Sequence, residues 1–124
     1  DLKHVSDIMH IGSSVPIAKL EDKMSKSLIT MTKKSFGCIG VVDYKKNIVG
    51  VITDGDLRRK LNSKFFEKTA KDIMTKNPTL ANKEMLVGEA INIMNAKKIT
   101  SLFVCEGKKP IGIIHIHDLL RLSS

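Results

Sequence analysis

The chain is short and basic, with 124 residues, 42% hydrophobic residues and a formal net charge of +8 at pH 7. This length predicts one domain or two small interlocked ones. No apolar run reaches the roughly 20 residues that a membrane-spanning helix needs. The N-terminus lacks a signal-peptide pattern and starts at Asp1 rather than Met. We therefore expect a cytoplasmic segment of a longer protein.

The two cysteines, Cys38 and Cys105, lie far apart in the sequence and inside apolar runs. They form no CxxC pair and have no metal-ligand spacing. Because unpaired cysteine is among the most buried residue types, we expect two free, buried thiols in a reducing compartment.

The sequence repeats itself. The triplet Asp-Ile-Met at 7–9 recurs at 72–74, and the run at 49–57 aligns with the run at 111–119. The blocks keep the same order in both copies, with small differences in offset that indicate short deletions in turns. This pattern is typical of an internal duplication.

Each copy has the periodicity of a small α/β unit. Apolar residues recur at helical spacing, and two β-branched runs flank a polar turn, which indicates a hairpin. The predicted elements are a strand at 15–18, a helix at 24–31, strands at 38–42 and 48–53, a helix capped by Asp54 that runs to Leu61, a strand at 79–81, a helix at 87–94, strands at 102–105 and 111–116, and a closing helix at 119–122.

These elements predict an α/β (α+β) fold made of two tandem βαββα units, at residues 1–66 and 67–124. One unit of about 60 residues is marginal as an independent fold. We therefore expect the two copies to pack with pseudo-two-fold symmetry. A cleft between such copies would offer two similar pockets for a ligand.

The repeated blocks carry a family resemblance. With Asp-Ile-Met at the start of each copy and Gly-Val-Ile-Thr-Asp-Gly-Asp-Leu at 50–57, the chain resembles a pair of cystathionine-β-synthase (CBS) domains, a Bateman module. The resemblance runs from about Val5 to Leu122. The stretches 53–59 and 115–121 are similar to the C-terminal module of bacterial arabinose-5-phosphate isomerases.

The resemblance implies a regulatory role in a larger enzyme. In that isomerase family a sugar-isomerase (SIS) domain precedes the CBS pair and interconverts ribulose 5-phosphate and arabinose 5-phosphate, which supplies Kdo for lipopolysaccharide or capsule. Nothing in this chain resembles the SIS domain, so we expect no catalytic residue and no turnover here. The family also implies a homodimer of CBS pairs, in a tetrameric full enzyme.

The resemblance further assigns a ligand site. A Thr followed three residues later by Asp holds ribose and phosphate in CBS families, although a carboxylate at 54 or 56 can also simply cap a helix. The neighbouring Arg58 and Arg59 can each make bidentate contacts to a phosphate or a carboxylate. In the second copy a histidine replaces the threonine, which puts nucleotide binding there in question. The predicted ligand-binding residues are Thr53, Asp56, Arg58, Arg59, Thr100, Ser101, His115 and Asp118.

Two ligand classes fit the predicted site. One is an adenine nucleotide, which is usual for the family, and the other is CMP-Kdo, the activated end product of the pathway. The basic surplus suits an acidic sugar, with seven Lys or Arg and two acids between Leu57 and Lys76. No cofactor is required by either reading.

Four other readings compete with a nucleotide sensor. His115, His117 and Asp118 are metal-ligand types, but no third His or Cys lies nearby in the sequence. A second alternative is catalysis by the chain itself, but no catalytic motif stands out in the sequence. A third alternative is nucleic-acid binding, which the pI of about 9.6 favours. The 4% aromatic content, however, provides few side chains on which bases could stack. The last alternative is a structural, oligomer-forming module without ligand.

Overall fold

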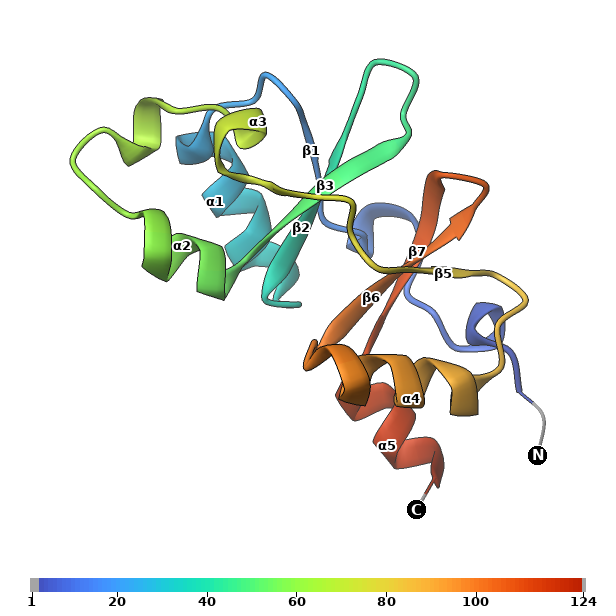
Figure 1. Ribbon diagram of the computed structural model, residues 1–124. Coiled ribbons are helices and arrows are strands. Elements are labelled where there is room, and N and C mark those ends of the chain that lie inside the picture. The colour runs from blue at the N-terminus through green and yellow to red at the C-terminus, as the bar shows by residue number, and fades with distance from the viewer. Residues whose placement is uncertain (1–2, 124) are drawn as a thin grey trace. The chain divides into compact units, whose positions relative to one another are not determined.

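The computed structural model describes residues 3–123, which form two compact units (Figure 1). One unit comprises residues 16–78. The other, here called the split unit, joins the N-terminal segment up to residue 15 with the chain from residue 79 onward. The predicted sequence boundary between residues 66 and 67 stays a prediction about the repeats, because the compact units combine the segments differently.

The 16–78 unit holds a four-stranded sheet of order β1-β2-β3-β4. The β1–β2 pair is parallel, and the two remaining pairs are antiparallel. The elements of the unit are β1 (Ile17–Lys19), α1 (Met24–Lys34), β2 (Cys38–Val42), β3 (Ile48–Thr53), α2 (Asp54–Lys60), the 3-10 turn η3 (Phe65–Glu67), α3 (Ala70–Ile73) and β4 (Thr75–Lys76).

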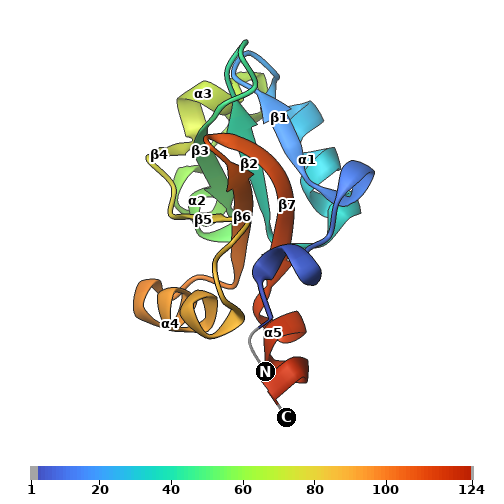
Figure 2. The same cartoon turned by 90° about the vertical axis from the view of Figure 1, so that its right-hand side faces the viewer.

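The split unit repeats this plan with a three-stranded sheet of order β5-β6-β7. The place that β4 takes in the 16–78 unit is taken here by a single bridge between His10 and Ile113. Helices α4 and α5 contact each other (Figure 1 and Figure 2). Helix α4 also contacts β6, and α5 contacts β7. The elements are η1 (Val5–Asp7), η2 (Gly12–Ser14), β5 (Leu80–Asn82), α4 (Val87–Lys97), β6 (Ser101–Glu106), β7 (Lys109–His115) and α5 (Ile116–Ser123).

Each unit has its own apolar core. In the 16–78 unit β2 is buried along its whole length, while β3 alternates buried and half-buried residues, so one face of β3 is more exposed than the other. The largest fully buried side chain of that core is Phe65, and Leu102, Ile114 and Leu119 are fully buried in the core of the split unit. Burial of this apolar surface is the main force that holds each unit together.

A glycine in each hairpin lets the returning chain approach closely. A Cβ atom at Gly50 would lie 2.4 Å from Sδ of Met74, and one at Gly112 would lie 2.4 Å from Sδ of Met9. Each methionine comes from the Asp-Ile-Met triplet that marks a repeat. The repeated triplet and the repeated glycine are therefore two sides of one packing contact.

The fold prediction is confirmed: the chain has a mixed α/β fold with two tandem units. The hairpins and the helices α1 and α4 fall at the predicted places. The closing helix is longer than predicted, because α5 begins at Ile116, which the prediction gave to the preceding strand. The predicted cap of α2 was also wrong. Asp54 does not cap α2; it is the first residue of the helix, and the cap is Thr53. Thr53 is the cap because its hydroxyl oxygen accepts from the Asp56 amide, while the Asp56 carboxylate accepts from the Thr53 amide.

Candidate ligand site at the strand-to-helix junctions

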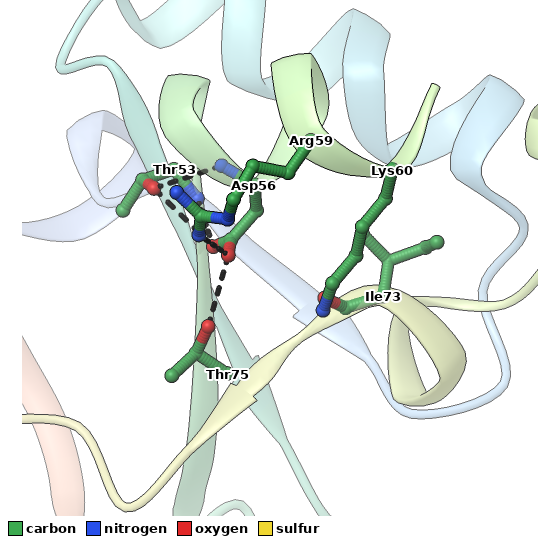
Figure 3. A network of polar contacts seen from close by, with 6 residues as sticks. All are labelled: Thr53, Asp56, Arg59, Lys60, Ile73 and Thr75. Atoms are coloured by element: carbon green, nitrogen blue, oxygen red, sulfur yellow. Dashed lines mark hydrogen bonds and ion pairs between the residues drawn. The ribbon is translucent and has the colours of Figure 1, made fainter. Parts of the chain in front are cut away.

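The first junction lies where β3 passes into α2 (Figure 3). The hydroxyl Oγ1 of Thr53 accepts from the Asp56 amide at 3.4 Å, and Oδ2 of Asp56 accepts from the Thr53 amide at 3.0 Å. The Thr53 hydroxyl also donates to Oδ2 at 3.2 Å. This reciprocal capping box fixes the carboxylate at the start of the helix.

The carboxylate of Asp56 is buried, with the residue 1% exposed, and both its oxygens are engaged. Its Oδ1 accepts from Nη2 of Arg59 at 2.6 Å and from the hydroxyl of Thr75 at 2.9 Å (Figure 3). Burial acts to raise the pKa of Asp56, but the hydrogen bonds from Thr53 and Thr75 and the charge of Arg59 outweigh it and lower the pKa below 3.8. Asp56 is therefore an anion at neutral pH.

Three cations form the last turn of α2 beside this carboxylate: Arg58, Arg59 and Lys60. Gly55 leaves room for the Arg59 side chain, because a Cβ there would lie 3.1 Å from Nη1 of Arg59. Lys60 donates to the carbonyl of Ile73 at 2.7 Å. Arg59 pairs with Asp56 although its own side chain is 65% exposed, so its guanidinium faces both the buried acid and solvent.

A small pocket of about 220 Å³ opens next to this junction. It lies below the usual size of a site for a whole ligand, about 300–1,000 Å³, so it has room for part of a nucleotide at most. The sequence pattern gave no sign of this pocket, because half of its lining comes from an otherwise ordinary core helix. Its lining residues are Leu28, Met31, Thr32, Ser35, Gly37 and Asp54.

The second junction lies where β7 passes into α5. Asp118 takes the place of Asp56, and its Oδ2 accepts from the His115 amide at 3.3 Å and lies 2.9 Å from Nε2 of His10. Its Oδ1 accepts from Arg121. The helix cap differs from that of α2, because Nδ1 of His115 accepts from the amide of His117 at 3.1 Å.

The electrostatics of the second junction follow from these contacts. Burial acts to raise the pKa of Asp118, but the hydrogen bonds from His10, His115 and Arg121 outweigh it and lower the pKa below 3.8. The pKa of His115 is lowered from 6.5, chiefly by burial and then by the nearby His117 and His10, against the opposing charge of Asp118. The fold thus favours a neutral His115.

The structure gathers the predicted residues into two groups. Thr53, Asp56, Arg58 and Arg59 meet at the first junction, as described above. At the second junction Ser101 pairs with His115 across β6 and β7, and the Thr100 carbonyl accepts from the first amide of α5 at 2.8 Å.

Sequence reasoning missed two residues, Thr75 and His10. Each reaches the aspartate of its junction from the segment just after a repeated Asp-Ile-Met triplet. The repeat itself held the signal, because both residues directly follow that triplet.

Positive charge is unevenly divided between the units. The 16–78 unit has 14 Lys or Arg and seven acids, and the split unit has seven Lys or Arg and six acids. The 16–78 unit therefore carries +7 of the net charge of +8. An anion would be attracted mainly to that unit.

Within residues 3–123, no group of three or more His, Cys, Asp or Glu side chains is arranged to hold a metal ion. The same part of the chain has no helix that is long and apolar enough to span a bilayer.

The fold and the paired junctions define a class: a tandem α/β pair with one acid-centred junction in each unit. The CBS domain family matches residues 5–63 and 70–124, so the chain belongs to the CBS domain family.

Two relatives match nearly the whole chain and only part of their own length. The chain is 42% identical to the uncharacterized protein RP505 of Rickettsia prowazekii, over 98% of this chain and 38% of that protein. It is 35% identical to the arabinose 5-phosphate isomerase KdsD of Escherichia coli K12, over 97% of this chain and 37% of that enzyme. The chain thus spans less than two fifths of the length of these relatives and is homologous to the CBS region of KdsD.

Solved structures of CBS pairs share the fold over nearly the whole chain. CBSX2, in complex with AMP, superposes with a TM-score of 0.82 at 25% identity, covering 97% of this chain and 95% of CBSX2. The CBS pair of MJ0100, in complex with 5′-methylthioadenosine and S-adenosyl-L-methionine, gives a TM-score of 0.83 at 24% identity, covering 99% of this chain and 97% of that chain.

Proposed function

We propose that the chain is the nucleotide-sensing CBS pair of an arabinose-5-phosphate isomerase, and that it binds an adenine nucleotide or CMP-Kdo at its strand-to-helix junctions. The catalytic SIS domain would lie elsewhere in the full protein, and the chain itself would not catalyse the isomerisation. The homology to KdsD supports the enzyme, and the AMP complex of CBSX2 supports the ligand class.

The observation that carries this proposal is the first junction. A buried, ionised Asp56 stands beside three cations in the more basic unit. A ribose needs an acceptor for its hydroxyls, and a phosphate or carboxylate needs fixed positive charge. The junction provides both within a single turn of helix.

Ligand binding at this junction requires an exchange of partners. The oxygens of Asp56 already accept from Thr53, Arg59 and Thr75, so a ribose hydroxyl must replace one of them. Arg59 is the partner that leaves most readily, because its side chain is largely exposed. Released from Asp56, its guanidinium can pair with the phosphate of the same ligand.

The second junction would bind with different chemistry. His115 and His10 replace the hydroxyl groups of the first junction, and Arg121 replaces Arg59. Thr100 and Ser101 border the same helix start. Such a site offers imidazole donors to an acidic sugar, which favours CMP-Kdo as its occupant.

In the full protein, the ligand would regulate the isomerase. It would do so only through different affinities for two arrangements of the module and the catalytic domain, with a coupling of about 1–3 kcal/mol. The family also favours a cytoplasmic homodimer of CBS pairs within a tetramer. These assignments of partner, pathway and location belong to the proposal.

Isothermal titration of the chain with AMP and with CMP-Kdo tests the proposal. We expect Arg59→Gln to lower the affinity for the nucleotide by roughly tenfold or more, because one charge-assisted contact contributes about 1.5–3 kcal/mol. Arg121→Gln tests the second junction in the same way. Lys45→Gln, in the exposed turn between β2 and β3, removes the same charge at the end of β3 opposite the first junction and is the matched control.

The outcomes separate the alternatives. Equal binding by Arg59→Gln, Arg121→Gln and the parent chain would show that the ligand site is elsewhere. Failure of the parent to bind either nucleotide would favour a structural, oligomer-forming module instead. That alternative has support in α5, where Leu120 and Leu122 are about half exposed.

A further inference from the structure

Two histidines contact Asp118, whereas two threonines contact Asp56. His10 stands where the first junction has Thr75, and both contact the aspartate of their unit. His115 likewise stands where the first junction has Thr53. His117, in the first turn of α5, completes the set.

The helix cap of α5 depends on the protonation state of His115. Its Nδ1 accepts the amide hydrogen of His117 at 3.1 Å, so the neutral ring must carry its hydrogen on Nε2. A second proton can bind only at Nδ1, where it would remove the lone pair that caps the helix. Two N–H donors would then face each other, and the imidazolium would have to turn away from the helix start.

The groups that face His115 come from every element packed around it. His117 and Asp118 belong to α5, and its ring lies 4.6 Å from the His117 ring, centroid to centroid. His10 comes from the N-terminal segment. Strand β6 presents Ser101, which does not titrate at these pH values. Two potential positive charges and one negative charge therefore act on the ring.

His10 contacts the Asp118 carboxylate from the N-terminal segment. The contact of its Nε2 with Oδ2 of Asp118 at 2.9 Å becomes an ion pair when the ring is charged. The same oxygen accepts from the His115 amide. The contact with His10 thus holds Asp118 in place, while protonation of His115 removes the bond from its Nδ1 to the helix start.

We propose that the β7–α5 junction is a proton-sensitive switch, in which protonation of His115 opens the N-terminal cap of α5 while His10 holds Asp118. The first junction has no such response, because a threonine hydroxyl caps α2. This device is independent of any ligand, so it does not depend on the proposed nucleotide function.

Nuclear magnetic resonance of the chain between pH 7.5 and 5.5 tests the switch. At pH 7.5 we expect His115 in the Nε2–H tautomer. As the pH falls, the protection of the His117 amide against exchange, corrected for intrinsic rates, should drop about fivefold, the factor that one ordinary helix cap represents. The amide of Asp56, capped by Thr53, should keep its protection and is the internal control.

Two reciprocal variants sharpen the test. His115→Thr should abolish the pH response at α5, and Thr53→His should create one at α2. An Nδ1–H tautomer at pH 7.5, or protection of the His117 amide that does not change with pH, would overturn the proposal. A pH response that survives in His115→Thr would do the same. Because the tautomer and the protection are measured on the parent chain, the test stands even if a variant fails to fold.

Discussion

The two strand-to-helix junctions have the same framework and different chemistry. Each has an aspartate at the third helical position, an arginine three residues later and a donor from the segment after an Asp-Ile-Met triplet. The first uses hydroxyl groups around a fully buried carboxylate in the basic unit. The second uses imidazoles around a carboxylate that is partly exposed. Duplication thus preserved the backbone geometry, while the donors around the acid diverged.

The largest effect that we expect in this comparison comes from removing the aspartates. Asp56→Ala should destabilise the chain by about 3 kcal/mol, because its 2% exposed side chain leaves several buried donors without an acceptor. Asp118→Ala should cost about 1–2 kcal/mol, because the 15% exposed site lets water replace the acceptor. Urea unfolding measures both. Equal losses would show that burial does not distinguish the junctions.

The hairpin glycines should show that the two units are alike in packing. A Cβ at Gly50 would lie 3.0 Å from the Thr75 carbonyl oxygen, and one at Gly112 would lie 3.0 Å from that of His10, besides the methionine contacts. Each change to Ala should therefore destabilise by about 2 kcal/mol, which thermal unfolding can measure. Gly88→Ala, in α4, is the control. An added Cβ there has no neighbouring atom within 4 Å, so the change should stabilise the chain by about 0.5–1 kcal/mol. A clear difference between the two hairpins would break the comparison.

Acid should lower the folding stability contributed by both junctions below about pH 4, but only that of the second junction at higher pH. The folded pKa values of Asp56 and Asp118 lie below 3.8, so their contribution is complete above about pH 4 and is lost as the pH falls through the folded values. The contribution of His115 has the same sign but a higher upper limit: its folded pKa lies below 6.5, so its contribution is complete above about pH 6.5 and is lost as the pH falls through the folded value.

Unfolding curves from pH 8 to pH 2 measure this pattern. Between pH 7 and pH 5 the loss of stability should disappear in His115→Thr, and below pH 4 it should become smaller in Asp56→Asn. A loss between pH 7 and pH 5 that persists unchanged in His115→Thr would contradict the assignment to the second junction.

The smallest effect is expected from an ion pair away from both junctions. Lys83 donates to Glu106, and this hydrogen bond raises the pKa of Lys83 and lowers that of Glu106. Both side chains are largely in contact with solvent, where such pairs add little to stability. Lys83→Ala should leave the urea midpoint unchanged within error. A distinct shift of the midpoint would show that this exposed pair matters more than the argument allows.

The sequence by itself determined the duplicated α/β plan and one half of each site. Strands at 38–42 and 48–53 follow from β-branched runs around a polar turn, and the Thr-x-x-Asp spacing is read from adjacent residues. These features depend on local periodicity and local hydrogen bonds, which a sequence displays directly. The identity of the cap was harder even locally, because Thr53 and Asp54 are both good capping residues and only the helix start decides between them.

Only the tertiary structure decided the other half of each site. Thr75 reaches Asp56 across 19 residues, and His10 reaches Asp118 across 108. It also decided that the N-terminal segment joins the second copy rather than the first. Contacts of this kind depend on which strand edge the returning chain meets, here over a hairpin glycine. Local periodicity does not carry that information, because the energy of such a contact depends on two segments that are distant in the sequence.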